Sequence, residues 1–154
     1  MSGTSLIGRQ DELAQINRFF GLLREEGSRS LLVVGEVGIG KTTLLNWARG
    51  EATDHGLRVL SASPVESEVP LEFAALADLL EKVPRILFDE LPDPQRKAIG
   101  VSIFRDEVPD EPVDQRTLAT AVFGTLRRVA ADTPVLLAVD DLPWLDVPSA
   151  RVLS

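Results

Sequence analysis

A glycine-rich segment carries the residues whose types and spacing best fit a defined chemistry. Residues 35–42 read GEVGIGKT and match G-x-x-x-x-G-K-S/T, the spacing of a phosphate-binding loop. Glycines let the backbone wrap around an oxyanion, and the N–H groups at a helix start then face the phosphate. Lys41 would supply charge to the β- and γ-phosphates, and Thr42 a hydroxyl to Mg²⁺. The pattern therefore predicts a site for a nucleoside triphosphate. The predicted binding residues are Gly35, Glu36, Val37, Gly38, Ile39, Gly40, Lys41, Thr42 and Thr43.

Two adjacent carboxylates follow an apolar segment later in the chain. Residues 135–141 read VLLAVDD. P-loop NTPases use a carboxylate at the end of a hydrophobic strand to hold the metal ion. We expect Asp140 to act on Mg²⁺ through its water shell, beside Thr42, and Asp141 to polarise the attacking water. Asp141 and Lys41 are thus the predicted catalytic residues.

Each motif also has an interpretation without catalysis. A glycine-rich turn can join a strand to a helix and bind nothing. Two acids at a strand end can begin a loop or cap a helix. The nucleotide interpretation is favoured because the two motifs occur together and the loop has a predicted strand before it and a predicted helix after it.

Apolar patterns predict the elements that must position these residues. SLLVVG, residues 30–35, is typical of a strand covered on both faces. A helix is predicted from Lys41 to about Asp54, with Gly56 placed to end it. LRVLSA, residues 57–62, predicts a second strand, and VLLAV, residues 135–139, a third buried one. Strand, helix and strand in this order indicate a right-handed crossover and a parallel sheet.

Further amphipathic segments predict helices. Residues 9–26 place Leu13, Ile16, Phe20 and Leu23 at helical spacing, and Gly27 would end that helix. Between residues 64 and 113 two helices are predicted within a proline-rich helical insertion, one over residues 70–83 and one over residues 93–104, the latter capped by Asp93 with Pro94 at its first position. From Asp114 a last long helix buries one stripe, made by Leu118, Val122, Leu126 and Val129.

Composition excludes several classes of protein. Of the 154 residues, 44% are hydrophobic and 26% charged, as in an ordinary globular domain. The net charge of −8 repels the phosphate backbone of nucleic acids, so we expect this segment not to bind nucleic acid. The lack of cysteine excludes disulfides and thiolate metal sites. No apolar run could span a bilayer and the N-terminus lacks a secretion-signal pattern, so we expect a cytoplasmic protein with no membrane partner.

Several phrases in order along nearly the whole chain resemble one family. LIGRQDEL, GEVGIGKTTLL, PLEFAALADLL, LPDPQRKAI and PVLLAVDDLPWLDVPSARVL are similar to the N-terminal ATPase domain of large ATP-binding regulators of the LuxR family. These bacterial transcription factors are STAND signalling NTPases, relatives of AAA+ proteins. The resemblance implies ATP or ADP with Mg²⁺ as ligands.

The resemblance also implies residues that the motifs do not. The segment similar to LIGR lies near the adenine in such proteins, so Leu6, Ile7, Gly8 and Arg9 are expected to contact the base; the alternative is an ordinary capped helix start. In the phrase after the two acids, Trp144 is expected to be an apolar anchor and Asp146 a helix cap.

Other parts of the family pattern are missing from these residues. Such ATPase domains continue into a strand with a polar nucleotide sensor and a helical lid, and then into a helical region and a DNA-binding helix-turn-helix. The expected fold is therefore an α/β P-loop NTPase with a parallel sheet flanked by helices, incomplete because the sensor strand and lid are missing. DNA would be contacted only through a C-terminal domain absent here. Open strand edges would favour self-association.

One partial domain is expected over residues 1–154. Its expected parts are an N-terminal helix segment (1–29), a P-loop βαβ unit (30–62), the helical insertion (64–113) and a helix with the acid-bearing strand (114–154).

Three hypotheses for function remain. The first is the ATP-binding module of a slow signalling ATPase that regulates transcription. The second is an AAA+-like motor, which uses the same residues but turns over fast in a ring. The third is a fragment that binds no nucleotide and acts only as an interaction module. Rate and assembly distinguish the first two, and nucleotide binding distinguishes the third.

Overall fold

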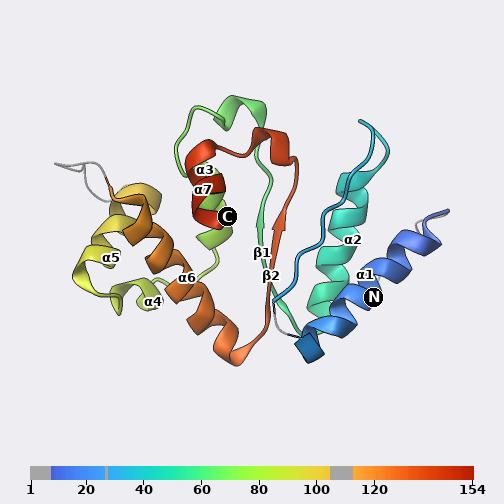
Figure 1. The fold of residues 1–154 in the computed structure, drawn as a ribbon, viewed down its shortest axis with the longest axis horizontal. Coiled ribbons are helices and arrows are strands. Elements are labelled where there is room, and N and C mark those ends of the chain that lie inside the picture. Colours follow the sequence, from blue (N-terminus) through green and yellow to red (C-terminus); the bar gives the residue numbers. More distant parts are fainter. Residues whose placement is uncertain (1–7, 27, 105–112) are drawn as a thin grey trace. The chain divides into compact units, whose positions relative to one another are not determined.

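Figure 1 shows the computed structural model, which describes residues 8–26, 28–104 and 113–154. The chain forms two units, Met1–Leu57 and Arg58–Ser154. The glycine-rich segment belongs to the first unit, and the acid pair and the helical insertion belong to the second.

The first helix, α1 (Gln10–Glu26), is the predicted amphipathic helix. Ile16 and Phe20, on its predicted apolar stripe, are only 3% and 4% exposed, and the helix contacts α2 of the same unit. The side chain of Leu23 and the predicted terminator Gly27 lie outside the described part of the chain. Helix α1 thus buries the face that the spacing of its apolar residues predicts.

The second helix, α2 (Lys41–Asp54), has the predicted bounds. Its C-terminal end is a Schellman motif, in which the Leu57 N–H donates to the Ala52 carbonyl and the Gly56 N–H to the Thr53 carbonyl, both at 2.9 Å. Gly56 has a φ of 78°, which glycine adopts without a steric penalty. The glycine predicted to end the helix therefore does so.

Residues 28–36 form no strand, which corrects the prediction for residues 30–35. Leu31, Leu32 and Val34 are 46%, 66% and 82% exposed, so the segment is not covered on both faces. A strand needs hydrogen bonds to a neighbouring strand, and a local run of branched side chains favours extended backbone without providing that neighbour.

The second unit contains a two-stranded parallel sheet, which confirms that the sheet is parallel but not the crossover predicted from residues 30–35 to residues 57–62. β1 (Arg58–Ala62) pairs with β2 (Val135–Val139), and Leu60 lies opposite Leu137. Leu60 is fully buried but Leu137 is 39% exposed, so the prediction that residues 135–139 form a buried strand is wrong in this respect. In Figure 1 the helices of this unit lie on one side of the two strands.

Helices make up most of the rest of the second unit. They are α3 (Ala74–Leu80), α4 (Ile86–Asp89), α5 (Asp93–Ile99), α6 (Gln115–Asp132) and α7 (Val147–Leu153), with 3₁₀ turns η1 (Glu66–Glu68) and η3 (Leu142–Trp144) and a π-helical turn η2 (Gly100–Phe104). Helix α6 is confirmed, and α3 lies within the range predicted. The predicted helix over residues 93–104 is divided at Gly100, and Pro92 occupies the N-cap position in place of Asp93.

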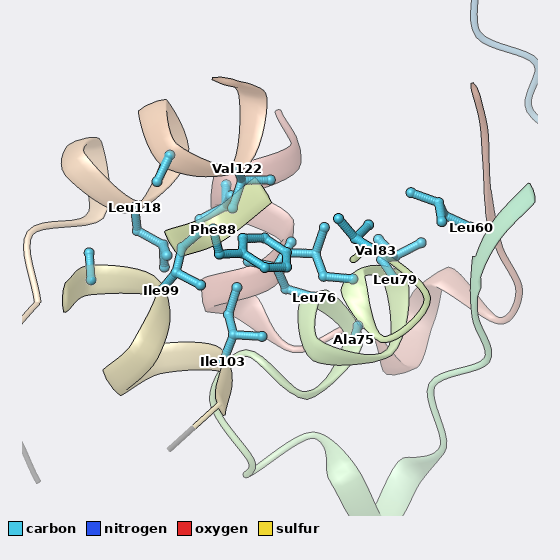
Figure 2. Packing of buried hydrophobic residues seen from close by; sticks show 14 of the residues in the cluster. Leu60, Ala75, Leu76, Leu79, Val83, Phe88, Ile99, Ile103, Leu118 and Val122 are labelled. Carbon is cyan, nitrogen blue, oxygen red and sulfur yellow. The ribbon is translucent and has the colours of Figure 1, made fainter. Parts of the chain in front are cut away.

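One hydrophobic core joins the helices of the second unit to its sheet (Figure 2). Phe88 lies near the middle of the labelled residues, and its ring meets the ring of Phe104 edge-on with 5.1 Å between the centroids. Leu118 and Val122, on the predicted stripe of α6, are fully buried in the same core as Leu60. The helical insertion is therefore packed as part of the unit that carries the acid pair.

Candidate functional site

The glycine-rich segment forms a turn that leads directly into α2. Gly38 and Gly40 have φ values of 77° and 94°, and Gly40 is the N-cap residue. No side chain caps the helix and its first turn has no acidic residue. The backbone N–H groups of the first turn are thus not satisfied by side chains, and the helix dipole favours an anion there.

Side chains at the glycine positions would disturb this turn. A Cβ built on Gly35 would lie 3.0 Å from Cγ2 of Ile39, so the Ile39 side chain would have to move by a few tenths of an ångström. Positive φ at Gly40 is strained for any residue with a Cβ. The local geometry therefore explains why the motif needs glycine where it has it.

Lys41 is held by the loop itself. Its Nζ donates to the carbonyl oxygens of Gly35 at 3.0 Å and Glu36 at 2.9 Å. An ammonium has three donors, so a third remains for a ligand in the same place. The lysine charge therefore lies at the loop.

Arg9 also contacts the glycine-rich turn. Its guanidinium donates to the carbonyl oxygen of Ile39 and pairs with the Glu12 carboxylate at 3.0 Å. A hydrogen bond from its own backbone N–H, followed by that from Arg9, lowers the pKa of Glu12. A Cβ on Gly40 would lie 3.7 Å from Nη2 of Arg9. Arg9 thus braces the loop, a role that the sequence did not reveal.

The remaining predicted residues of the first unit are mostly exposed. Thr42 and Thr43 are exposed in the first turn of α2, and Val37 is fully exposed at the loop. Gly8 is exposed with a φ of 80°. Leu6 and Ile7 lie outside the described residues. Exposed hydroxyls and loop amides are accessible to a ligand from solvent.

In the second unit the acid pair follows β2 as predicted. The Asp140 N–H donates to the Ala62 carbonyl at 3.1 Å, which continues the sheet pairing by one residue. The Asp140 carboxylate is buried and accepts the Asp141 N–H at 3.0 Å. Asp141 is exposed and has a φ of 45°, in the left-handed region. The strand end therefore fixes one carboxylate and turns the other toward solvent.

The family model of the AAA ATPase domain matches residues 5–154. The chain belongs to the AAA ATPase domain family. Membership implies a P-loop NTPase that binds nucleotide with Mg²⁺, which confirms the fold class at that level. No curated protein and no solved structure matches the chain significantly.

One part of the AAA ATPase domain fits the phosphate chain of a nucleotide. The uncapped start of α2 and the lysine at the loop fit a phosphate chain. Within the described ranges, no three His, Asp or Glu side chains group to hold a metal ion by themselves. Mg²⁺ is usually held by one or two protein ligands together with phosphate oxygens and water. In the same ranges no helix is long and apolar enough to cross a membrane.

The predictions for two residues that follow the acid pair in the AAA ATPase domain have different outcomes. Asp146 accepts the Ser149 N–H at 2.9 Å and is the N-cap of α7, as predicted. Trp144 is 38% exposed, so the prediction of an apolar anchor is wrong. The carboxylate of Asp146 also accepts backbone N–H groups near the start of α3, which the sequence did not indicate.

Proposed function

We propose that this chain is the ATP-binding module of a bacterial signalling ATPase that regulates transcription. The observation that carries the proposal is the loop of the first unit, where Lys41 lies against the Gly35 and Glu36 carbonyls at an uncapped helix start. Such a start binds phosphate through backbone N–H groups and the helix dipole.

Each predicted residue has a distinct role in this proposal. The amides of residues 35–43 would surround the β-phosphate, and Lys41 would use its third donor on the β- and γ-phosphates. Thr42 and Asp140 are proposed to hold Mg²⁺, directly and through water respectively. Asp141 would polarise the attacking water, and residues 7–9 would lie at the nucleotide. Bound Mg²⁺ would neutralise phosphate charge.

A switch requires ATP and ADP to be distinguished by contacts. Moving a two-state protein from 1:99 to 99:1 needs roughly 5.5 kcal/mol of preference for one state. The γ-phosphate and its Mg²⁺ would provide contacts that ADP cannot make. Without a stabilising arginine, P-loop enzymes can be as slow as about 10⁻⁴ per second, which suits a signal that persists.

The regulatory part of the proposal rests on the resemblance to LuxR-family regulators. In these proteins the DNA is read by a separate helix-turn-helix region, so the net charge of −8 here does not oppose the proposal. The exposed apolar segment at Leu31, Leu32 and Val34 supports the accompanying expectation of self-association.

Equilibrium binding of a fluorescent ATP analogue, with Mg²⁺ and with EDTA, tests the proposal. Lys41→Ala should abolish most of the binding because it removes the charge at the phosphates. Lys82→Ala, at an exposed lysine of the second unit, is the matched control and should bind like the wild type. Wild-type protein that binds no analogue would favour the interaction-module hypothesis instead. Binding that Lys41→Ala leaves intact would refute the assignment of Lys41 to the phosphates.

A further inference from the structure

The Asp146 carboxylate joins two segments that are far apart in the sequence. It is only 2% exposed. Its Oδ1 accepts the Ser149 N–H and the Phe73 N–H, both at 2.9 Å, and its Oδ2 accepts the Ala75 N–H at 3.1 Å. One side chain therefore satisfies backbone donors at the starts of two helices, α7 and α3.

The start of α3 depends on this external carboxylate. Its N-cap residue is Phe73, whose side chain cannot accept a hydrogen bond, and whose φ of 62° is unusual for an aromatic residue. The fully buried Ser149 completes the arrangement, because its Oγ accepts the Leu76 N–H at 3.0 Å. Helix α3 is thus capped by α7, and we call Asp146 with Ser149 the interhelical cap.

The same segment of chain carries the acid pair. At one end, Asp140 is fixed to β1 through its N–H bond to Ala62. At the other end, Asp146 is fixed to α3. Between these points Leu142 and Trp144 are 46% and 38% exposed, whereas Leu145 packs against the core. Hydrogen bonds at its two ends, together with the packing of Leu145, therefore determine where the segment lies.

We infer that Asp146 is a positioning residue, which couples the start of α3 to the placement of Asp140 and Asp141. A shift of α3 would move the interhelical cap and with it the segment that bears the acid pair. The helical insertion could in this way influence the metal side of the site. That consequence for the metal rests on the proposed function, whereas the coupling itself does not.

Three substitutions separate this role from ordinary helix capping. Asp146→Asn keeps the shape but replaces one acceptor oxygen with a donor amide, which would face a buried N–H group. Asp114→Asn is the matched control. Asp114 is an exposed N-cap that accepts from Thr117, at 2.9 Å from the N–H and 2.7 Å from the hydroxyl, and Thr117 lies in the first turn of α6. Ser149→Ala removes one bond and leaves the carboxylate in place.

Amide hydrogen exchange of the whole nucleotide-free chain tests the coupling. In Asp146→Asn, exchange should become about tenfold faster or more both at residues 73–76 and at residues 140–146. In Asp114→Asn, only the first turn of α6 should change. Faster exchange at residues 73–76 with residues 140–146 unchanged would overturn the coupling. Should Asp146→Asn fail to fold, Ser149→Ala makes the same comparison with a smaller effect.

Binding of the ATP analogue supplies the second readout. Asp146→Asn should lower the affinity with Mg²⁺ by about tenfold, as loss of a supporting residue behind a metal ligand commonly does, and leave the affinity in EDTA unchanged. Equal losses with and without Mg²⁺ would show a merely structural role and overturn the positioning role. A wild-type protein without any Mg²⁺-dependent binding would refute the proposed function, and the exchange experiment would still decide the coupling.

Discussion

The Nζ of Lys41 lies 3.0 Å from the carbonyl oxygen of Gly35, the first glycine of the loop that the lysine follows. The second loop carbonyl, from Glu36, is 2.9 Å away. The ammonium therefore bridges the loop from its far end and holds it closed around the start of α2. Because two of its three donors are used, a phosphate can add to this arrangement without first disrupting it.

Arg9 should affect the loop through the Ile39 carbonyl. Arg9→Ala removes that hydrogen bond and the ion pair with Glu12. We expect the affinity for the ATP analogue to fall about fivefold, which corresponds to roughly 1 kcal/mol, with Mg²⁺ and with EDTA alike. Arg18→Ala, at an exposed arginine of α1, should change neither value. An unchanged affinity in Arg9→Ala would show that the loop does not need the brace.

Substitution of Asp140 should affect Mg²⁺-dependent binding, whereas substitution of Asp141 should affect hydrolysis. Asp140→Asn should reduce the Mg²⁺-dependent part of the ATP affinity by about tenfold or more, and the amide oxygen can still accept the Asp141 N–H. Asp141→Asn should retain this affinity and slow single-turnover hydrolysis by about 10² or more. If Asp140→Asn bound the Mg²⁺ complex as the wild type does, the metal assignment would be wrong.

Replacing two glycines of the first unit by alanine should change the free energy of unfolding in opposite directions. Gly56 has a φ of 78° at the C-terminal end of α2, so Gly56→Ala should lower the free energy of unfolding by about 1 kcal/mol. Gly50 lies within α2, where a Cβ would meet no atom within 4 Å, so Gly50→Ala should raise it by up to about 1 kcal/mol. Thermal unfolding followed by circular dichroism compares the two. A destabilising Gly50→Ala would contradict the open surroundings of that position.

The contribution of Asp78 to the free energy of unfolding should fall as the pH rises. Partial burial of the carboxyl group raises the pKa of Asp78, and the negative charges of Glu68 and Glu81 raise it further. The folded state therefore holds this proton more tightly than the unfolded state does, where the pKa is near 3.8. The resulting stability is present below that pH and is lost as the pH rises through the folded-state pKa.

Asp78→Asn provides the measurement. The variant should unfold about 1 or 2 °C higher than the wild type at pH 7, because exposed charge interactions are worth roughly 0.5 kcal/mol. Near pH 3 the difference should vanish. Equal unfolding temperatures at pH 7 would show that the like charges do not repel one another measurably.

Local patterns predicted the elements that depend on nearby residues. The bounds of α2, the glycine that ends it, the stripe of α6 and the acid at the end of β2 all follow from spacing within one segment. The same applies to the cap of α7 by Asp146, since Ser149 is three residues away. Membership of the AAA ATPase domain family agrees with these motifs.

Features that depend on distant partners were not predictable in this way. Residues 30–35 have the composition of a buried strand, but composition does not provide a neighbour to pair with. The bond from Phe73 to Asp146 joins residues 73 positions apart, and that from Arg9 to Ile39 joins residues 30 apart. Only the folded chain brings these groups together, so neither the interhelical cap nor the loop brace has a local sequence signature.

The external cap of α3 bears on the order of events during synthesis. The segment that becomes α3 leaves the ribosome well before residues 146–149 have been made. A seven-residue helix is marginal without tertiary contacts, and this one would also lack acceptors for its first amides until then. Arg58–Ser154 should therefore acquire its native structure late, when its last helix emerges, and nascent chains stalled earlier should be open to proteolysis there.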